Sequence, residues 1–274
     1  MVKHSANAEA ATLPFRLVET LGIACGYERS FKLSASDAQG NIQANRYLLG
    51  INTCDLETRA LHKICREMQM PENLFQSFNA GLSEANLIFI GFEEGQRGPG
   101  MYKIYLEYWD KIQTRLQTIV AKDAQLLLHK GFKWAIDAPQ KQVITEYHTL
   151  PKLGTDALKQ RILTQYLNKA NAQSIHAALK IIQQAALAVP KQCFIYVDVS
   201  EQGNQRQSFD VNLYPAQLLI KDIYPTLLEV STALNIDMNL LERLMGIIRD
   251  KNLGHISAGT GRDGQPYFTV YYEY

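Results

Sequence analysis

The 274-residue sequence predicts an α+β fold: a ten-stranded antiparallel β-barrel of five repeated ββα units, surrounded by helices. Two observations lead to this prediction. Five segments each contain an apolar run, a turn rich in Gly, Asn or Asp, and a second run that alternates with period two, which is typical of a β-hairpin. Segments with helical spacing of apolar residues separate them. The expected hairpins cover residues 31–52, 87–109, 131–148, 193–215 and 253–274.

The elements follow in order. Residues 1–13 are small and polar, and we expect them to be frayed. The helix expected over 56–70 carries apolar residues at helical spacing and is followed by Pro71, a common helix stop. Residues 71–84 have a weak helical pattern and are interpreted as a connector.

The C-terminal half has two helices before the fourth hairpin and two before the fifth. Thr155 or Asp156 can cap the first of the four, and Pro190 closes the second. Pro225 interrupts the third. The expected helices of the whole chain cover 15–24, 56–70, 110–127, 155–168, 172–188, 217–233 and 238–249.

Helices that cover one face of each hairpin leave the other face to be buried in some other way. Ten strands can close into a barrel, or pairs of units can form separate sandwiches. The barrel is favoured because it removes exposed strand edges and accounts for polar and aromatic residues on the uncovered face. A barrel wider than eight strands also has room for a ligand. We therefore expect residues 14–274 to form a single barrel domain.

Composition excludes several functions. Lys+Arg 28 against Asp+Glu 27 gives a net charge of +1, so nothing points to nucleic acid or an anionic membrane. The four Cys have no CxxC spacing and the His have no metal spacing, so no protein metal site is expected. The sequence shows no secretory signal and no run of ~18 apolar residues. We expect a cytoplasmic monomer.

The second strands of four hairpins share a signature: a polar residue, one spacer, then Tyr. Residues two apart in a strand lie on one face, so closure of the sheet would bring these groups together. The alternative is that Thr and Tyr are simply good strand residues. The first hairpin has Arg46 at the polar position. The four pairs are Lys103 and Tyr105, Thr145 and Tyr147, Asn212 and Tyr214, and Thr269 and Tyr271.

Short motifs in the same order resemble a known family. Glu28-Arg-Ser-Phe-Lys-Leu33, followed by Asn45-Arg46-Tyr-Leu-Leu49, resembles the first hairpin of the cyanobactin-type peptide prenyltransferases, which have the αββα (ABBA) barrel. Tyr102-Lys103-Ile104-Tyr105 resembles the second hairpin of that family, and the Tyr-rich last strand resembles its ending. Val211-Asn-Leu-Tyr214 is similar to a strand of bacterial aromatic prenyltransferases with this fold. Thr269 stands where the family tends to have Arg, and Arg262 could replace that contact.

The resemblance implies transfer of a dimethylallyl or geranyl group from its diphosphate to a peptide side chain, as in the modification of ribosomally made natural products (RiPPs), or to a small aromatic acceptor. Mg²⁺ would bind on the diphosphate. The alternative is an inactive barrel that binds a hydrophobic ligand or peptide. Glu28 is the candidate base. The diphosphate would contact Arg46, Lys103, Lys133, Asn212 and Thr269, and the prenyl and acceptor pocket would contain Tyr105, Tyr147, Tyr196, Tyr214, His255 and Tyr271.

Overall fold

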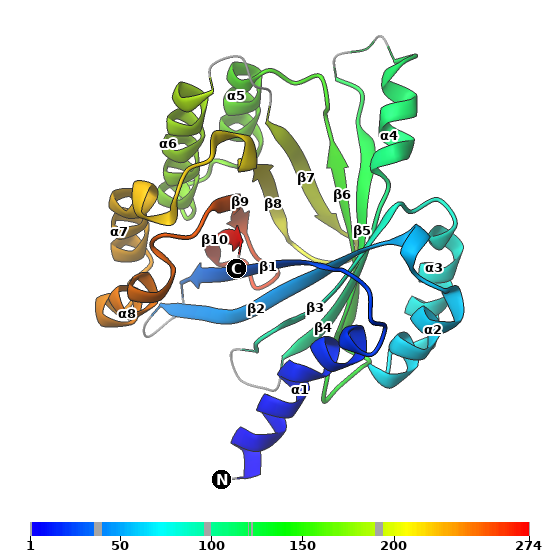
Figure 1. The fold of residues 1–274 in the computed structure, drawn as a ribbon. Helices are drawn as coiled ribbons and strands as arrows, with labels where there is room; N and C mark the ends of the chain where they lie inside the picture. The colour runs from blue at the N-terminus through cyan, green and yellow to red at the C-terminus, as the bar shows by residue number, and fades with distance from the viewer. Residues whose placement is uncertain are drawn as a thin grey trace. The chain divides into compact units, whose positions relative to one another are not determined.

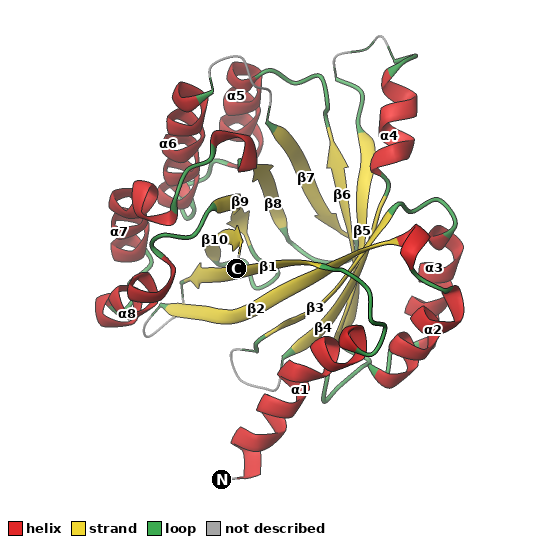
Figure 2. Ribbon diagram, in the orientation of Figure 1, coloured by secondary structure: helices red, strands yellow, loops and turns green. Residues whose placement is uncertain are grey.

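A computed structural model describes residues 2–35, 40–95, 100–119, 121, 123–189 and 194–273, with the side chains of residues 2–7 outside the description (Figure 1). Ten strands form one closed antiparallel barrel in the order β1-β10-β9-β8-β7-β6-β5-β4-β3-β2. Each strand thus pairs with its neighbours in sequence, and β1 also pairs with β10 (Figure 2). The predicted fold class is confirmed.

The strands lie close to the five expected hairpins, but the turn residues 37–39 and 96–99 fall outside the described residues. The strands are β1 (Gly26–Ser34), β2 (Asn41–Asn52), β3 (Leu87–Glu93), β4 (Met101–Glu107), β5 (Leu126–Ala135), β6 (Gln142–Thr149), β7 (Ile195–Glu201), β8 (Gln207–Asn212), β9 (Leu253–Thr260) and β10 (Pro266–Glu273).

The α-helices are α1 (Val2–Glu19), α2 (Thr58–Glu67), α3 (Glu72–Leu82), α4 (Trp109–Leu116), α5 (Thr155–Tyr166), α6 (Ala172–Ala188), α7 (Tyr224–Ala233) and α8 (Met238–Ile248). Three short 3₁₀ turns are η1 (Thr53–Asp55), η2 (Tyr214–Ala216) and η3 (Ile220–Ile223). In the described part of the chain, no helix combines the length and apolar character needed to span a membrane.

Several helices differ from the sequence-based expectation. The helix expected over 217–233 begins only at Tyr224, after the 3₁₀ turn η3, so Pro225 lies in its first turn. The segment expected to be frayed is helical from Val2, and the carbonyl of Ala11 accepts a hydrogen bond of 2.7 Å from the Tyr47 hydroxyl. The weakly patterned connector contains α3, because the buried side chains of Leu74 and Phe78 anchor it to the core. Helix α4 ends at Leu116, and the next described element is a strand that starts ten residues later.

The chain divides into two compact units. Unit 1 comprises Met1–Arg29, Asn45–Ile119 and Leu127–Tyr147, and unit 2 comprises Ser30–Ala44, Val120–Leu126 and His148–Tyr274. Each has its own hydrophobic cluster between helices and strands. That residues 14–274 fold as a single domain stays a prediction.

In unit 1, alternation along the strands separates an apolar face from a polar one. Tyr102, Ile104 and Leu106 of β4 join the hydrophobic cluster that also contains Ile64 of α2 and Phe78 of α3. Successive side chains of a strand point to opposite faces. The intervening residues of β4 therefore lie on the face turned away from this cluster, which we call the inner face.

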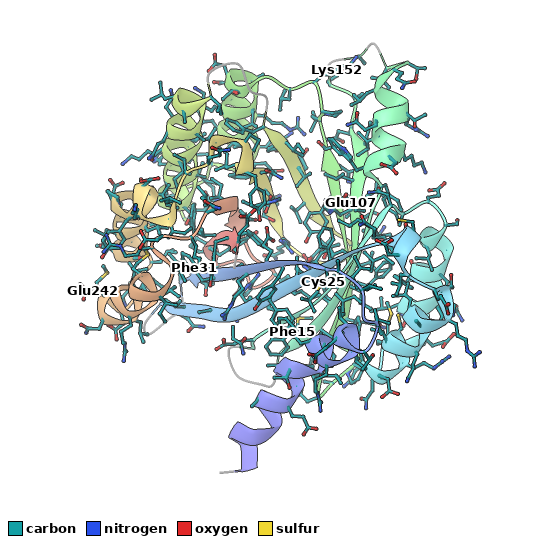
Figure 3. All side chains as sticks on the ribbon, viewed as in Figure 1. Phe15, Cys25, Phe31, Glu107, Lys152 and Glu242 are labelled. Atoms are coloured by element: carbon teal, nitrogen blue, oxygen red, sulfur yellow. The ribbon has the colours of Figure 1, made fainter. Side chains whose placement is uncertain are left out.

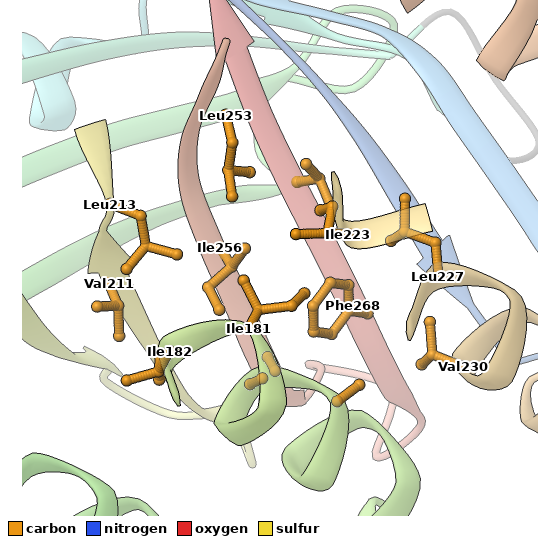
Figure 4. Packing of buried hydrophobic residues seen from close by; sticks show 14 of the residues in the cluster. Ile181, Ile182, Val211, Leu213, Ile223, Leu227, Val230, Leu253, Ile256 and Phe268 are labelled. Atoms are coloured by element: carbon orange, nitrogen blue, oxygen red, sulfur yellow. The ribbon is translucent and has the colours of Figure 1, made fainter. Parts of the chain in front are cut away.

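In unit 2, the same alternation packs β8, β9 and β10 against α6. Figure 4 shows Ile181 and Ile182 of α6 beside Val211, Ile256 and Phe268, which come from the three strands. All five side chains are fully buried. The inner face of this unit carries the residues between them, such as Ser257 and Thr269.

Candidate functional site

Three cations lie on the inner face of unit 1, on β2, β4 and β5. Lys103 of β4 lies directly opposite Lys133 of β5, and Gly91 of β3 lies on the other side of Lys103. Arg46 of β2 lies opposite Glu93 of β3. Like charges directly opposite each other in a sheet are destabilising. The pairing of Lys103 with Lys133 therefore costs stability, which is typical of a functional site.

The three cations are buried. Relative exposure is 6% for Arg46, 3% for Lys103 and 5% for Lys133. Long cationic side chains are almost never fully buried unless they are paired. A group of three in one small area is therefore a candidate for an anion site, and we call it the cation cluster.

Glu93 contacts two members of the cation cluster. Its Oε1 lies 3.1 Å from Arg46 Nη1, and its Oε2 lies 3.5 Å from Lys103 Nζ. The charge of Glu28 also acts on Lys103. Among the described contacts of the cluster, the three cations outnumber the two carboxylates, an arrangement that suits an incoming anion.

Burial lowers the pKa of the Lys103 ammonium to about 8, and the charge of Arg46 acts in the same direction. The carboxylates of Glu93 and Glu28 partly oppose this. An anion that binds beside Lys103 would favour the protonated amine further. The structure thus brings Glu28, Arg46 and Lys103 into one electrostatic group.

Two tyrosines lie beside the cluster. The Lys133 ammonium lies 3.4 Å from the Tyr147 hydroxyl, 5.6 Å from the centre of the Tyr105 ring and 6.0 Å from that of Tyr147. The two rings meet edge to face with their centres 5.8 Å apart. Electron-rich ring faces beside a fixed cation show that this position tolerates positive charge.

Gly131 makes room for one of these rings. It lies directly opposite Tyr105, and a Cβ atom at this position would come within 2.6 Å of the ring. The glycine is therefore required by the packing of Tyr105 rather than by backbone conformation. The sequence analysis did not single it out, although its place opposite the Tyr of the Lys-x-Tyr pair is a usable signal.

Beyond the two tyrosines, the inner face carries a further aromatic group and an ion pair. His129 Nε2 lies 3.5 Å from Glu107 Oε2, and Figure 3 labels Glu107. The His129 ring contacts Phe89 and Tyr147 at centre distances of 6.0 and 5.8 Å. Phe89, Glu107 and His129 were not among the site residues predicted from the sequence.

Unit 2 contains another inner-face cluster around His255. Its Nδ1 lies 2.9 Å from Asp210 Oδ1, and its ring meets those of Tyr214 and Tyr271 at centre distances of 5.3 and 5.8 Å. His255, Tyr214 and Tyr271, all predicted pocket residues, are thus neighbours. Tyr214 lies in η2 rather than in the strand where it was expected, because β8 ends two residues earlier.

The two neutral residues predicted to contact diphosphate both lie in unit 2. Thr269 is buried and lies opposite Ser257 of β9. Asn212 is half-buried, and its side-chain oxygen accepts a hydrogen bond of 3.1 Å from the backbone N–H of Tyr214. This local bond makes Asn212 a turn residue as well as an inner-face one. Arg262, the suggested substitute for an Arg at position 269, forms bonds of 2.6 Å with Glu201.

Tyr196 does not line the inner face, so its assignment to the pocket needs correction. Its ring is buried in the hydrophobic cluster of unit 2, stacked against Phe209. Its hydroxyl donates to Asp198, which also accepts from Tyr166 of α5 and pairs with Arg161. Since Tyr196 and Asp198 are two apart in β7, both point toward the helices.

Tyr267 is an inner-face residue of unit 2 that the sequence analysis missed. The Lys32 ammonium lies 4.7 Å above its ring, and its hydroxyl lies 3.2 Å from Ser257 Oγ and 3.4 Å from Arg206. Burial alone would raise the pKa of this phenol, but the surrounding cations and hydroxyls outweigh it and lower the pKa. The signal was present, since Gln265-Pro-Tyr267 repeats the polar-x-Tyr spacing.

The fold is similar to that of solved prenyltransferase structures. The 5-dimethylallyl tryptophan synthase from Streptomyces coelicolor, in complex with DMASPP and Trp, matches with a TM-score of 0.60 and 13% identity over 100% of this chain and 89% of its own. PriB, in complex with L-tryptophan and dimethylallyl thiolodiphosphate, matches with a TM-score of 0.58 and 11% identity over 90% and 79%. AnaPT from Neosartorya fischeri matches with a TM-score of 0.52 and 12% identity over 90% and 78%.

No family model and no curated protein matches the sequence. At these identities the structural matches establish the fold. They confirm that the chain has the barrel of the ABBA prenyltransferases, as its motifs suggested.

Proposed function

We propose that the protein is a prenyltransferase that moves an isoprenyl group from its diphosphate to a nucleophilic acceptor. The observation that carries the proposal is the cation cluster of unit 1, in which Arg46, Lys103 and Lys133 are all buried beside two tyrosine rings. Positive side chains beside aromatic faces suit a reaction in which diphosphate departs and an allylic cation forms.

The cations act on the leaving group. As the C–O bond of the donor breaks, its electron pair goes to the diphosphate, and fixed positive charges stabilise the charge that develops there. Arg46 can bind two phosphate oxygens with its planar guanidinium, and the two lysines act as point charges. For unit 2, Asn212 and Thr269 stay proposed as neutral hydrogen-bond donors to a diphosphate, although Thr269 stands where the resembled family tends to have Arg.

The tyrosine rings act on the allylic cation. Tyr105 and Tyr147 offer aromatic faces at the position next to Lys133. Each such face beside a desolvated cation contributes on the order of 0.5–2 kcal/mol. The buried setting also keeps out water, which would otherwise trap the cation as an alcohol. For unit 2, Tyr214, His255 and Tyr271 stay proposed as residues of a prenyl or acceptor pocket.

Mg²⁺, when bound on the diphosphate, supplies additional neutralisation of the leaving group. Among the described residues, no group of three or more His, Cys, Asp or Glu side chains could hold a metal. The ion would therefore take its ligands from diphosphate oxygens and water, which suits magnesium. The carboxylates of the cation cluster are Glu93, which contacts Arg46 and Lys103, and Glu28, whose charge acts on Lys103.

The acceptor is proposed to be aromatic. Tryptophan is present in the complexes of two structural neighbours, and the sequence resemblance adds a peptide side chain as the more specific alternative. The acceptor must lose a proton. Unit 1 holds two groups that can take it: Glu28, predicted from its place on an inner strand of the barrel, and the His129–Glu107 pair, considered below.

The test is mass spectrometry of the protein incubated with dimethylallyl or geranyl diphosphate, Mg²⁺, and free amino acids and peptides that contain Trp, Tyr, His or Arg. We expect one acceptor to gain the mass of one isoprenyl unit. The double substitution of Arg46→Ala and Lys103→Ala should abolish the product. Absence of product from the whole panel, together with absence of heat stabilisation by an unreactive diphosphate analogue, would refute the proposal.

A further inference from the structure

The inner face of unit 1 is ordered in three levels along β4 and β5. Register pairs Lys103 with Lys133, then Tyr105 with Gly131, then Glu107 with His129. Each level is two residues from the next, a step of about 6.8 Å in an antiparallel strand. The cations thus lie at one end, the phenol rings in the middle, and a carboxylate–imidazole pair at the other end.

At the third level, Glu107 orients the imidazole ring of His129. Glu107 Oε2 lies 3.5 Å from His129 Nε2, and Glu107 Oε1 accepts a bond of 3.3 Å from the Asn86 amide. Both partners are mostly buried, with side-chain exposures of 22% for His129 and 18% for Glu107. A carboxylate on one ring nitrogen favours the proton there and leaves the basic lone pair on the other nitrogen.

The same level is walled by aromatic rings. The Phe89 ring is nearly parallel to that of His129, at 16° and a centre distance of 6.0 Å. The Tyr147 ring is 5.8 Å from His129, and its hydroxyl is 3.4 Å from Lys133. Tyr147 therefore joins the third level to the cation cluster. Flat apolar rings around one basic nitrogen form a suitable environment for an aromatic acceptor.

We propose that His129 is the catalytic base of the transfer, that Glu107 positions it, and that Phe89 and Tyr147 complete a subsite for an aromatic acceptor. The inference rests on the proposed function. A donor whose diphosphate lies on the cation cluster has its allylic carbon at the tyrosine level. The nucleophile then approaches from the side away from the leaving group, which is the third level.

The chemistry balances without another reactant. The C–O bond of the donor breaks and its electron pair leaves with the diphosphate. A π pair of the acceptor ring forms the new C–C bond and leaves a ring cation. His129 takes the proton from the alkylated carbon, the C–H pair restores the aromatic ring, and the imidazolium returns the proton to solvent.

Glu28, the other candidate base, does not belong to the same level of the inner face as His129. Its charge acts on Lys103, so it belongs with the cations as one of their counter-charges. The two candidates therefore predict different variants to be inactive. Among the described contacts of His129, the titratable partners are Glu107 of β4 and Tyr147 of β6, while Phe89 covers the ring from β3.

The first arm of the test measures kcat against pH with dimethylallyl diphosphate and the acceptor that forms product. A base that must be neutral makes kcat fall as the imidazole is protonated. His129→Asn should lower kcat by about 10²- to 10⁴-fold and remove this acid limb, while the binding of dimethylallyl thiolodiphosphate changes less than about threefold. Glu107→Gln should lower kcat less than His129→Asn does, and should shift the acid limb of the kcat–pH profile to another pH. Glu28→Gln is the control, and its profile should retain the acid limb.

A His129→Asn enzyme that retains kcat within about threefold, with the acid limb intact, would overturn the proposal. Urea midpoints of all variants show that loss of activity is not loss of fold. The second arm needs no turnover: the His129 ring signals, assigned by their absence in His129→Asn, are followed by NMR during addition of millimolar L-tryptophan. A shift supports the subsite and no shift overturns it, even if the wild type forms no product and the transfer reaction itself is refuted.

Discussion

Replacing Lys103 by methionine is expected to make the protein more stable while removing its affinity for diphosphate. Burial lowers the pKa of Lys103 from 10.5 to about 8. Since one pKa unit corresponds to 1.36 kcal/mol, the buried charge costs the folded state about 3 kcal/mol at neutral pH. Methionine removes this cost at similar volume but deprives Glu93 of one of its two cations. The net gain in the free energy of unfolding should be about 1–3 kcal/mol.

The sign of the pH dependence follows from proton binding. Between pH 8 and 10.5 the unfolded chain keeps a proton on Lys103 that the folded chain has released, so wild-type stability rises with pH across this window. Below the folded pKa both states are protonated and the cost is present in full. The advantage of Lys103→Met should therefore be largest at pH 7 and disappear above pH 10.5.

The assay is urea unfolding of both proteins at pH 7 and near pH 10, with and without inorganic pyrophosphate. Pyrophosphate should stabilise the wild type and not the variant. Lys111→Met is the control, since Lys111 is an exposed ion-pair partner of Glu84 and its loss should change stability by less than about 1 kcal/mol. A Lys103→Met protein that is less stable than wild type at pH 7 would refute the reasoning.

Three other substitutions test the site. Gly131→Ala should destabilise the fold by about 1–3 kcal/mol, measured by urea unfolding, and reduce transfer, because the new Cβ meets the Tyr105 ring at 2.6 Å; unchanged stability would contradict this packing. Arg46→Lys should weaken diphosphate binding about tenfold by calorimetry, since an ammonium lacks the planar fork, and equal affinity would exclude a two-point contact. Tyr196→Phe should cost about 1 kcal/mol of stability by removing its bond to Asp198 and leave donor affinity unchanged; a change in affinity would return it to the pocket.

The sequence was most informative where a strand alternates. The period-two alternation predicted that Lys103 and Tyr105 share a face of the strand. In the structure both lie on the inner face, which is turned away from the hydrophobic cluster of unit 1. Alternation does not show which face of a strand points inward, and this accounts for the error at Tyr196. Tyr196 and Asp198 share a face of β7, but a phenol and a carboxylate do not by themselves indicate that this face packs against the half-buried Arg161 of α5.

Residues whose role depends on a partner elsewhere in the chain could not be predicted. Glu93 is an ordinary strand residue until register places it opposite Arg46. His129 has no significance in sequence, because Glu107 and Phe89 come from two other strands. Helix α3 was missed for a similar reason, since tertiary burial of Phe78 outweighs its weak helical pattern.

Calorimetric titration of the protein with dimethylallyl thiolodiphosphate in the presence of Mg²⁺ tests the central claim most directly, because it examines the cation cluster apart from the choice of acceptor. The account predicts saturable binding by the wild type. It also predicts a loss of about a hundredfold or more in the double variant Arg46→Ala and Lys103→Met, since each charge-assisted contact is worth about 1.5–3 kcal/mol. Equal affinity of the two proteins, or no binding by the wild type, would contradict it.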